Sequence, residues 1–86
     1  MYDNARNIVL VRRAKEGDRE ALESVLRENA GLIKSVALRF QGRGQDTEDL
    51  IQIGTIGMMK AVHGFDEEFG TAFSTYAVHM VSGAVS

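Results

Sequence analysis

Few side chains able to do acid–base or metal chemistry occur in this 86-residue chain, and they are scattered. His63 and His79 stand far apart, there is no cysteine, and no metal-ligand spacing of the HExxH kind occurs. Asp66 with Glu67 or Glu68 resembles a carboxylate pair, but an acid–base pair needs two contrasting environments, and this solvated run offers none. We expect neither an enzyme nor a bound metal or cofactor.

A better candidate for function is one face of the helix expected over residues 48–64. Gln52, Thr55 and Met59 recur at the i, i+3, i+7 spacing of a helix face, and Asp49 extends the stripe by one turn. A carboxylate, an amide, a hydroxyl and a flexible thioether form an anchor set suited to binding another protein. This pattern favours protein recognition over catalysis.

Two glycines interrupt the same helix. Gly54 and Gly57 each cost on the order of 1 kcal/mol relative to alanine in a helix interior. Because they lack side chains, they allow a second helix to approach closely, either from a partner or from the chain's own core. Met58 shares a side with Leu50 and Gly54 and should fill the core, whereas Met59 should lie outside it.

The elements that must position this stripe are predicted to be helices. The sequence has no proline, its apolar residues recur with a helical period, and no strand-like alternation competes. The fold class is therefore all-α, a small bundle of about four to five helices in one domain over residues 1–86. The expected helices cover residues 4–15, 19–29, 30–41, 48–64 and 73–86, and an acidic connector covers 65–71. Gly17 should end the first helix, and Asp18 and Thr47 should cap the second and fourth.

Composition and charge limit the compartment in which this chain acts and the kinds of partner that it can bind. No segment approaches the roughly 18 apolar residues of a membrane span, and the lack of cysteine fits a reducing compartment, so we expect a cytoplasmic protein. Residues 1–45 hold nine Lys or Arg against six acids (+3), whereas residues 46–86 hold one against six (−5). Because the second half offers only Lys60 to phosphates, strong duplex DNA binding by this chain alone is not expected. The three acids of residues 46–49 favour a basic protein surface, or simply stabilise a solvated helix start.

Three motifs, in this order, resemble region 2 of the bacterial RNA polymerase sigma factors of the sigma-70 family: DLIQIGTIGMMKAV at residues 49–62, FD at 65–66 and FSTYA at 73–77. The resemblance extends over residues 8–84. It implies a sigma region 2 fold that binds core RNA polymerase by docking on a coiled coil of the β′ subunit. The implied polymerase-binding residues are Asp49, Gln52, Ile53, Thr55 and Met59. At Ile53 many primary sigma factors carry an acid, so apolar contact replaces a charge there.

The resemblance also implies a second partner, the unpaired bases of the promoter minus-ten element, which need stacking surfaces and polar groups. Phe65, Asp66, Thr75 and Tyr76 match the pocket of the first flipped adenine, which Phe73 supports, and Asn29, Leu32 and Ser35 match positions that receive a downstream thymine. The alternative is that Phe65, Phe73 and Tyr76 belong to the hydrophobic core. The sequence leaves both interpretations open.

Departures from the family pattern point to an alternative sigma factor of the sporulation or general-stress kind. His79 and Met80 replace a tryptophan pair that wedges the duplex open in primary sigma factors, so strand opening should be weaker. The chain stops at Ser86, before the end of region 2 and before regions 3 and 4, which indicates a fragment or a truncated form. The competing hypothesis is a sigma-like helical interaction module that an anti-sigma factor or another regulator binds, without direct DNA function.

Overall fold

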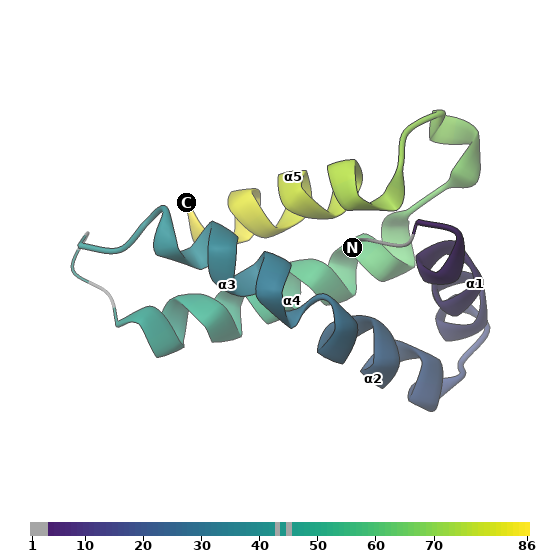
Figure 1. The fold of residues 1–86 in the computed structure, drawn as a ribbon, viewed down its shortest axis with the longest axis horizontal. Helices are drawn as coiled ribbons and strands as arrows, with labels where there is room; N and C mark the ends of the chain where they lie inside the picture. Colours follow the sequence, from purple (N-terminus) through teal and green to yellow (C-terminus); the bar gives the residue numbers. More distant parts are fainter. Residues whose placement is uncertain (1–3, 43, 45) are drawn as a thin grey trace.

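The computed structural model describes residues 4–42, 44 and 46–86, and these residues form five α-helices and one 3-10 turn without a strand (Figure 1). The elements are α1 (Asn4–Lys15), α2 (Arg19–Glu28), α3 (Ala30–Leu38), α4 (Thr47–Gly64), η1 (Glu67–Phe69) and α5 (Phe73–Val85). The prediction of an all-α bundle is confirmed. Arg43 and Gln45, in the expected break before the fourth helix, lie outside the described residues.

The end of α1 and the start of α2 follow the sequence closely. Gly17 adopts a φ of 99°, the left-handed conformation that ends a helix and favours glycine. One carboxylate oxygen of Asp18 accepts the N–H of Ala21 at 3.1 Å, and the Arg13 guanidinium donates to the other at 2.7 Å. The Ala21 bond first, and the Arg13 bond second, lower the pKa of Asp18. The predicted cap of α2 is therefore confirmed.

Three other helix boundaries differ from the prediction. The second helix ends at Glu28, because Asn29 leaves helical geometry with φ −106° and ψ 13°. The third helix ends at Leu38 and continues only as turns toward Gly42, whose φ is 89°. The predicted Thr47 cap is wrong, because Thr47 is already helical and Asp46 occupies the capping position, where its carbonyl accepts the N–H of Leu50.

The core is centred where α4 and α5 run side by side, with α3 packed on both (Figure 1). A Cβ added to Gly57 would lie 2.9 Å from the Cβ of Ala84 and 3.0 Å from the carbonyl oxygen of Met80. A Cβ on Gly54 would lie 3.0 Å from the Ile33 side chain. The two glycines therefore admit the chain's own helices, the second of the two possibilities left by the sequence. The largest fully buried side chains are those of Phe73, Leu50, Met58, Val25, Val36, Val62 and Val81.

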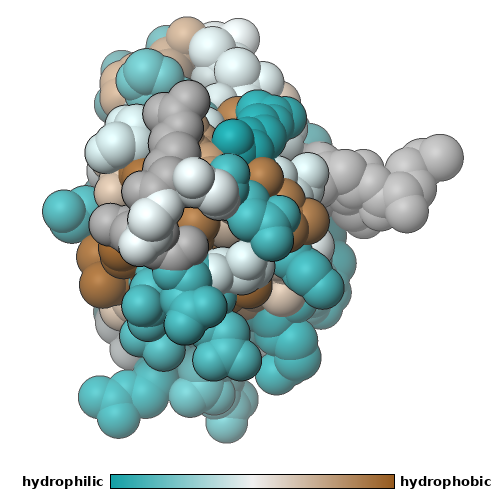
Figure 2. Space-filling view, turned by 90° about the vertical axis from the view of Figure 1, so that its left-hand side faces the viewer, coloured by the Kyte–Doolittle hydropathy of each residue, from teal (hydrophilic) through white to brown (hydrophobic). Residues whose placement is uncertain are grey.

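The molecular surface mixes hydrophobic and hydrophilic residues. Figure 2 shows this on the end of the molecule that lies at the left of Figure 1, where teal and brown residues alternate without a continuous apolar belt. No helix in the described part of the chain combines the length and the apolar character needed to cross a membrane.

Replacing Gly57 with alanine should destabilise the fold. The added methyl group meets backbone atoms of α5 that cannot rotate away, which costs about 1–3 kcal/mol, and the better helix propensity of alanine offsets at most about 1 kcal/mol. Gly83→Ala is the matched control, because its Cβ would meet nothing within 4 Å. Urea unfolding followed by circular dichroism measures both variants. Equal stability of the two would contradict this account of the α4–α5 contact.

Candidate functional site

The face of α4 opposite the core presents most of the predicted polymerase-binding residues to solvent. Asp49 and Gln52 are exposed, and Met59 keeps 36 % of its surface accessible. Ile53 and Thr55 are half-buried at the two edges of this face, and the Thr55 hydroxyl donates to the Ile51 carbonyl at 2.8 Å. The predicted contrast between the two methionines is confirmed, since Met58 is fully buried. These five side chains lie on one continuous surface, which we call the α4 face.

One residue of the α4 face was missed by the sequence reasoning. Ile56 is 54 % exposed and lines a shallow hollow with Asp49, Gln52 and Ile53. The signal was available, because Ile56 stands four residues after Gln52 and three after Ile53, and so belongs to the same helix face. With the half-buried Ile53 and the exposed Met59, Ile56 forms an apolar strip beside Asp49 and Gln52, and an apolar patch with a polar rim is typical of a contact surface for another protein.

A cluster of four aromatic rings joins the connector to the start of α5. The Phe65 ring stands edge-on to Phe73 at a centroid distance of 5.3 Å and lies 5.6 Å from Tyr76. Tyr76 is in turn 5.5 Å from Phe69, which is 51 % exposed. Phe65 and Phe73 are buried, as the core alternative expects, whereas Tyr76 is half-buried and Phe69 faces solvent. Gly64 makes room for Tyr76, because a Cβ there would stand 2.8 Å from the phenol oxygen.

Helix α1 holds this aromatic cluster and the connector from the side. The N–H of Phe73, at the start of α5, donates to the Asn4 side-chain oxygen at 3.0 Å, and Lys15 Nζ donates to the Phe65 carbonyl at 2.7 Å. The Arg12 guanidinium forms a two-pronged ion pair with Glu67, with Arg12 Nε to Glu67 Oε2 at 2.6 Å. This pair raises the pKa of Arg12 and lowers the pKa of Glu67. The connector, expected to be merely solvated, is tied to α1 at two points, and the first residue of α5 is tied to α1 at a third.

The residues predicted to form the adenine pocket differ in accessibility. Asp66 and Thr75 are exposed, and one carboxylate oxygen of Asp66 accepts the N–H of Glu68 at 2.9 Å. Tyr76 offers part of its ring to solvent, whereas Phe65 supports that ring from the core. As the structure stands, a base could stack on Tyr76 and not on Phe65.

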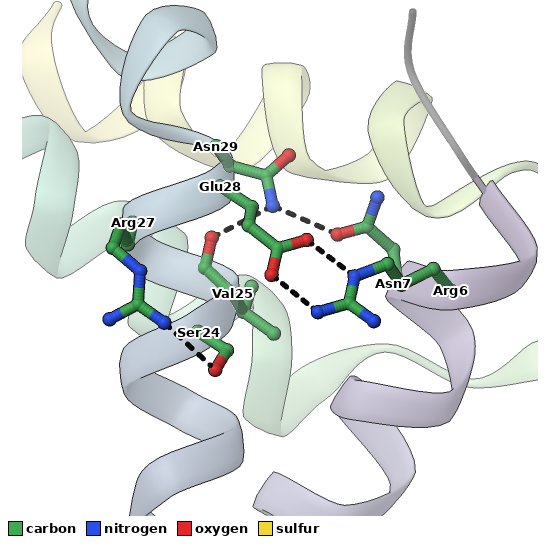
Figure 3. Close-up of polar contacts among 7 residues, drawn as sticks. All are labelled: Arg6, Asn7, Ser24, Val25, Arg27, Glu28 and Asn29. Atoms are coloured by element: carbon green, nitrogen blue, oxygen red, sulfur yellow. Dashed lines mark hydrogen bonds and ion pairs between the residues drawn. The ribbon is translucent and has the colours of Figure 1, made fainter.

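The residues matched to a downstream thymine lie elsewhere, at the junction of α2 and α3. Ser35 is exposed and Leu32 is half-buried, but Asn29 is only 2 % exposed. Figure 3 shows the reason: the Asn29 amide donates to the Asn7 side-chain oxygen at 2.9 Å and to the Val25 carbonyl at 2.8 Å. Its own side-chain oxygen is buried without a hydrogen bond. In this structure Asn29 joins α1 to α2, and its role toward a base stays a prediction.

An exposed ion pair between α1 and α2 lies beside Asn29. The Arg6 guanidinium donates two hydrogen bonds of 2.8 Å to the Glu28 carboxylate, in the fork-to-fork geometry drawn in Figure 3. This bonding lowers the pKa of Glu28. Among the described residues, no three His, Cys, Asp or Glu side chains gather as a metal site would require.

Comparison with known proteins assigns this arrangement to a family. The profile described as Sigma-70 region 2 matches residues 25–86. The RNA polymerase sigma-F factor of Priestia megaterium is 42% identical over 76 residues, which are 88% of this chain and 30% of that protein. The RNA polymerase sigma-G factor of Bacillus subtilis (strain 168) is 44% identical over 70 residues, or 81% of this chain and 27% of that protein. The RNA polymerase sigma factor SigA of Clostridium acetobutylicum is 43% identical over 79 residues, or 92% of this chain and 21% of that protein.

The chain belongs to the sigma-70 region 2 family. This confirms the resemblance drawn from the three motifs and agrees with the expectation of a transcription factor that is not an enzyme. The chain spans less than a third of the length of these relatives. The match includes the α4 face and the aromatic cluster and begins inside α2, so α1 precedes it.

Removing the Phe73 ring should cost far more stability than removing the Phe69 ring. Phe73→Ala leaves a cavity in the core beside Phe65 and should lower the free energy of unfolding by about 3–5 kcal/mol. Phe69→Ala removes a ring that is half in water and should cost less than about 1 kcal/mol. Urea unfolding measures both, with Phe73→Leu as the milder variant if the alanine form does not fold. Similar losses at the two positions would show that Phe69 is also part of the core.

Acid should weaken the fold through three carboxylates. The pKa values of Asp18, Glu28 and Glu67 are lowered from ordinary values of 3.8, 4.5 and 4.5, so their contribution is complete above those values. It is lost as the pH falls through the lowered folded-state pKa values, because the unfolded chain takes up protons first. Urea midpoints measured between about pH 7 and pH 3 should fall less steeply in Asp18→Asn than in the parent chain. Glu16→Gln is the control, and an unchanged slope in Asp18→Asn would contradict the assignment.

Proposed function

We propose that this chain is the region of an alternative sigma factor that docks on core RNA polymerase and contributes to recognition and melting of the promoter minus-ten element. The observation that carries the proposal is the α4 face, where an exposed carboxylate, amide and thioether surround the exposed Ile56. An apolar centre with a polar rim is the composition of a protein–protein contact. We propose the coiled coil of the β′ subunit as its partner, since family membership supports that assignment.

The second part of the proposed function places single-stranded promoter DNA on the connector and the start of α5. Tyr76 supplies a half-exposed ring, held from behind by Phe65, and Phe69 supplies a second ring that faces solvent. Base–aromatic stacking contributes roughly 1–3 kcal/mol per base, so two accessible rings suit an unpaired strand. Thr75, exposed beside Tyr76, provides a hydroxyl for a base edge.

We assign the chain to the alternative sigma factors because of the residues on α5. His79 is exposed and Met80 is half-buried, at the two positions where primary sigma factors carry their tryptophan wedge. Neither side chain stacks on a base pair as an indole does, so the holoenzyme should open promoters less readily than one that contains a primary sigma factor. Such a protein acts in the cytoplasm, and an anti-sigma factor that covers the α4 face would switch it off.

Replacing both Asp49 and Gln52 with alanine should weaken docking on the isolated β′ coiled coil. The two side chains are the exposed polar members of the α4 face, and losing both should weaken binding at least tenfold, on the scale of about 1–2 kcal/mol per interface residue. Glu20→Ala with Gln41→Ala is the control, because it removes one exposed acid and one exposed amide outside α4. Isothermal titration measures the affinities, and circular dichroism checks that each variant folds.

The outcomes separate the two functions under consideration. Binding by the parent and the control that the α4 variant loses supports polymerase docking. Absence of binding by a well-folded parent overturns polymerase docking and favours a sigma-like module that a regulator binds. Tyr76→Ala then tests the DNA function separately, because promoter opening by the reconstituted holoenzyme needs that ring and polymerase docking does not.

A further inference from the structure

The ion pair between Arg12 and Glu67 joins residues that lie 55 positions apart in the sequence, one on α1 and one in η1. The guanidinium meets the carboxylate through two nitrogens and two oxygens. Both side chains are open to water, with 59% and 43% of their surfaces exposed. Exposed ion pairs contribute little net stability, so another anion could replace the carboxylate at low cost.

The surroundings of this pair include a second cation. A pocket of about 380 Å³ lies between α1 and the connector, and Ile8, Val11 and Phe65 line it beside Arg12 and Lys15. The three acids of the connector, residues 66–68, also line this pocket. Lys15 commits one donor to the Phe65 carbonyl at 2.7 Å, and an ammonium group has two more to offer. A guanidinium that grips a carboxylate with two nitrogens grips a phosphate in the same way.

The acids of the connector would otherwise oppose a nucleic acid here. The Asp66 carboxylate accepts the N–H of Glu68 and is turned toward its own backbone, and Glu67 is turned toward Arg12. Glu67 therefore occupies the guanidinium of Arg12, two residues before the exposed Phe69 in the same short 3-10 turn. A carboxylate that binds a guanidinium in this way leaves the place that a phosphate could take.

We propose that Arg12 and Lys15 form a binding site for a backbone phosphate of single-stranded DNA, which Glu67 occupies in the free protein and releases when the strand binds. The proposal rests on the proposed function, because it needs a strand at the connector. When Glu67 is displaced, the connector keeps its tie to α1 through Lys15, and α5 keeps its tie to α1 through Asn4. Binding of other small anions at Arg12 is disfavoured, because any anion must compete with the intramolecular carboxylate of Glu67.

The test compares two substitutions that change the charge equally. Glu67→Gln removes the competing carboxylate, whereas Glu68→Gln removes an exposed carboxylate that lines the same pocket but forms no ion pair within the described ranges. Fluorescence anisotropy of the 86-residue chain with a short labelled single-stranded DNA oligonucleotide, over a range of salt concentrations, gives the affinities. Glu67→Gln should bind roughly threefold more tightly than Glu68→Gln, with a salt slope steeper by about 0.7, the value for one additional phosphate contact.

Two further variants identify the site. Arg12→Gln should bind more weakly than the parent, and the double variant Arg12→Gln, Glu67→Gln should lose the gain of Glu67→Gln. In Glu67→Gln, the side-chain Nε–Hε resonance of Arg12 should also shift on titration with inorganic phosphate and saturate. Equal affinities of Glu67→Gln and Glu68→Gln, a gain that survives without Arg12, or absence of binding by every variant would each overturn the proposal.

Failure of this proposal is distinguishable from failure of the proposed function. The β′ docking assay uses substitutions on α4, which do not touch Arg12. Loss of oligonucleotide binding in Tyr76→Ala, together with equal affinities of the two glutamine variants, would leave the promoter function standing and overturn only the phosphate site.

Discussion

The fold depends on the close approach of α5 to α4 at Gly57, where the backbone of Met80 and Val81 lies within about 3 Å of where a side chain would begin. Gly54 extends the contact by one turn toward Ile33 of α3. Because two helices close on the same side of α4, that side is fully committed to the core. The opposite side keeps Gln52 and Ile56 in water as a direct consequence. The two glycines thus lower the helix propensity of α4, but they allow the close packing of α3 and α5 that turns the α4 face toward solvent.

The same packing determines how the connector is held. It leaves α4 at Phe65 and enters α5 at Phe73, and these two buried rings meet edge to face with a centroid distance of 5.3 Å. Between them the backbone turns at Gly70, with a φ of 76°, so the exposed Phe69 folds back within 5.5 Å of Tyr76. The accessible rings are therefore preorganised by buried ones, so little ordering entropy would be lost in the base stacking that we propose.

The parts of the structure that could be predicted from sequence are those that local rules decide. The Gly17–Asp18 boundary follows from helix-ending and capping chemistry, and the burial of Met58 beside an exposed Met59 follows from helical periodicity. The Thr47 cap could not be predicted in the same way, because Asp46 and Thr47 are both good capping residues and only the backbone conformation chooses between them. The burial of Asn29 depends on a partner 22 residues away, which no local pattern reveals.

The ion pairs also divide into those between residues of the same half of the chain and one that joins the two halves. Two of the three ion pairs seen among the described residues, Arg6–Glu28 and Arg13–Asp18, close within the basic first half of the chain. Only Arg12–Glu67 reaches into the acidic second half. The acids at residues 46–49 therefore remain outside the ion pairs of the described structure, at the end of α4 next to Gln52. Acids in this position stabilise the start of α4, and beside the exposed Ile56 they would also favour the basic partner surface that we propose. Of the acids in the second half, those at the start of α4 therefore add negative charge to the α4 face. In the connector, the charge of Glu67 is instead paired with Arg12 of α1.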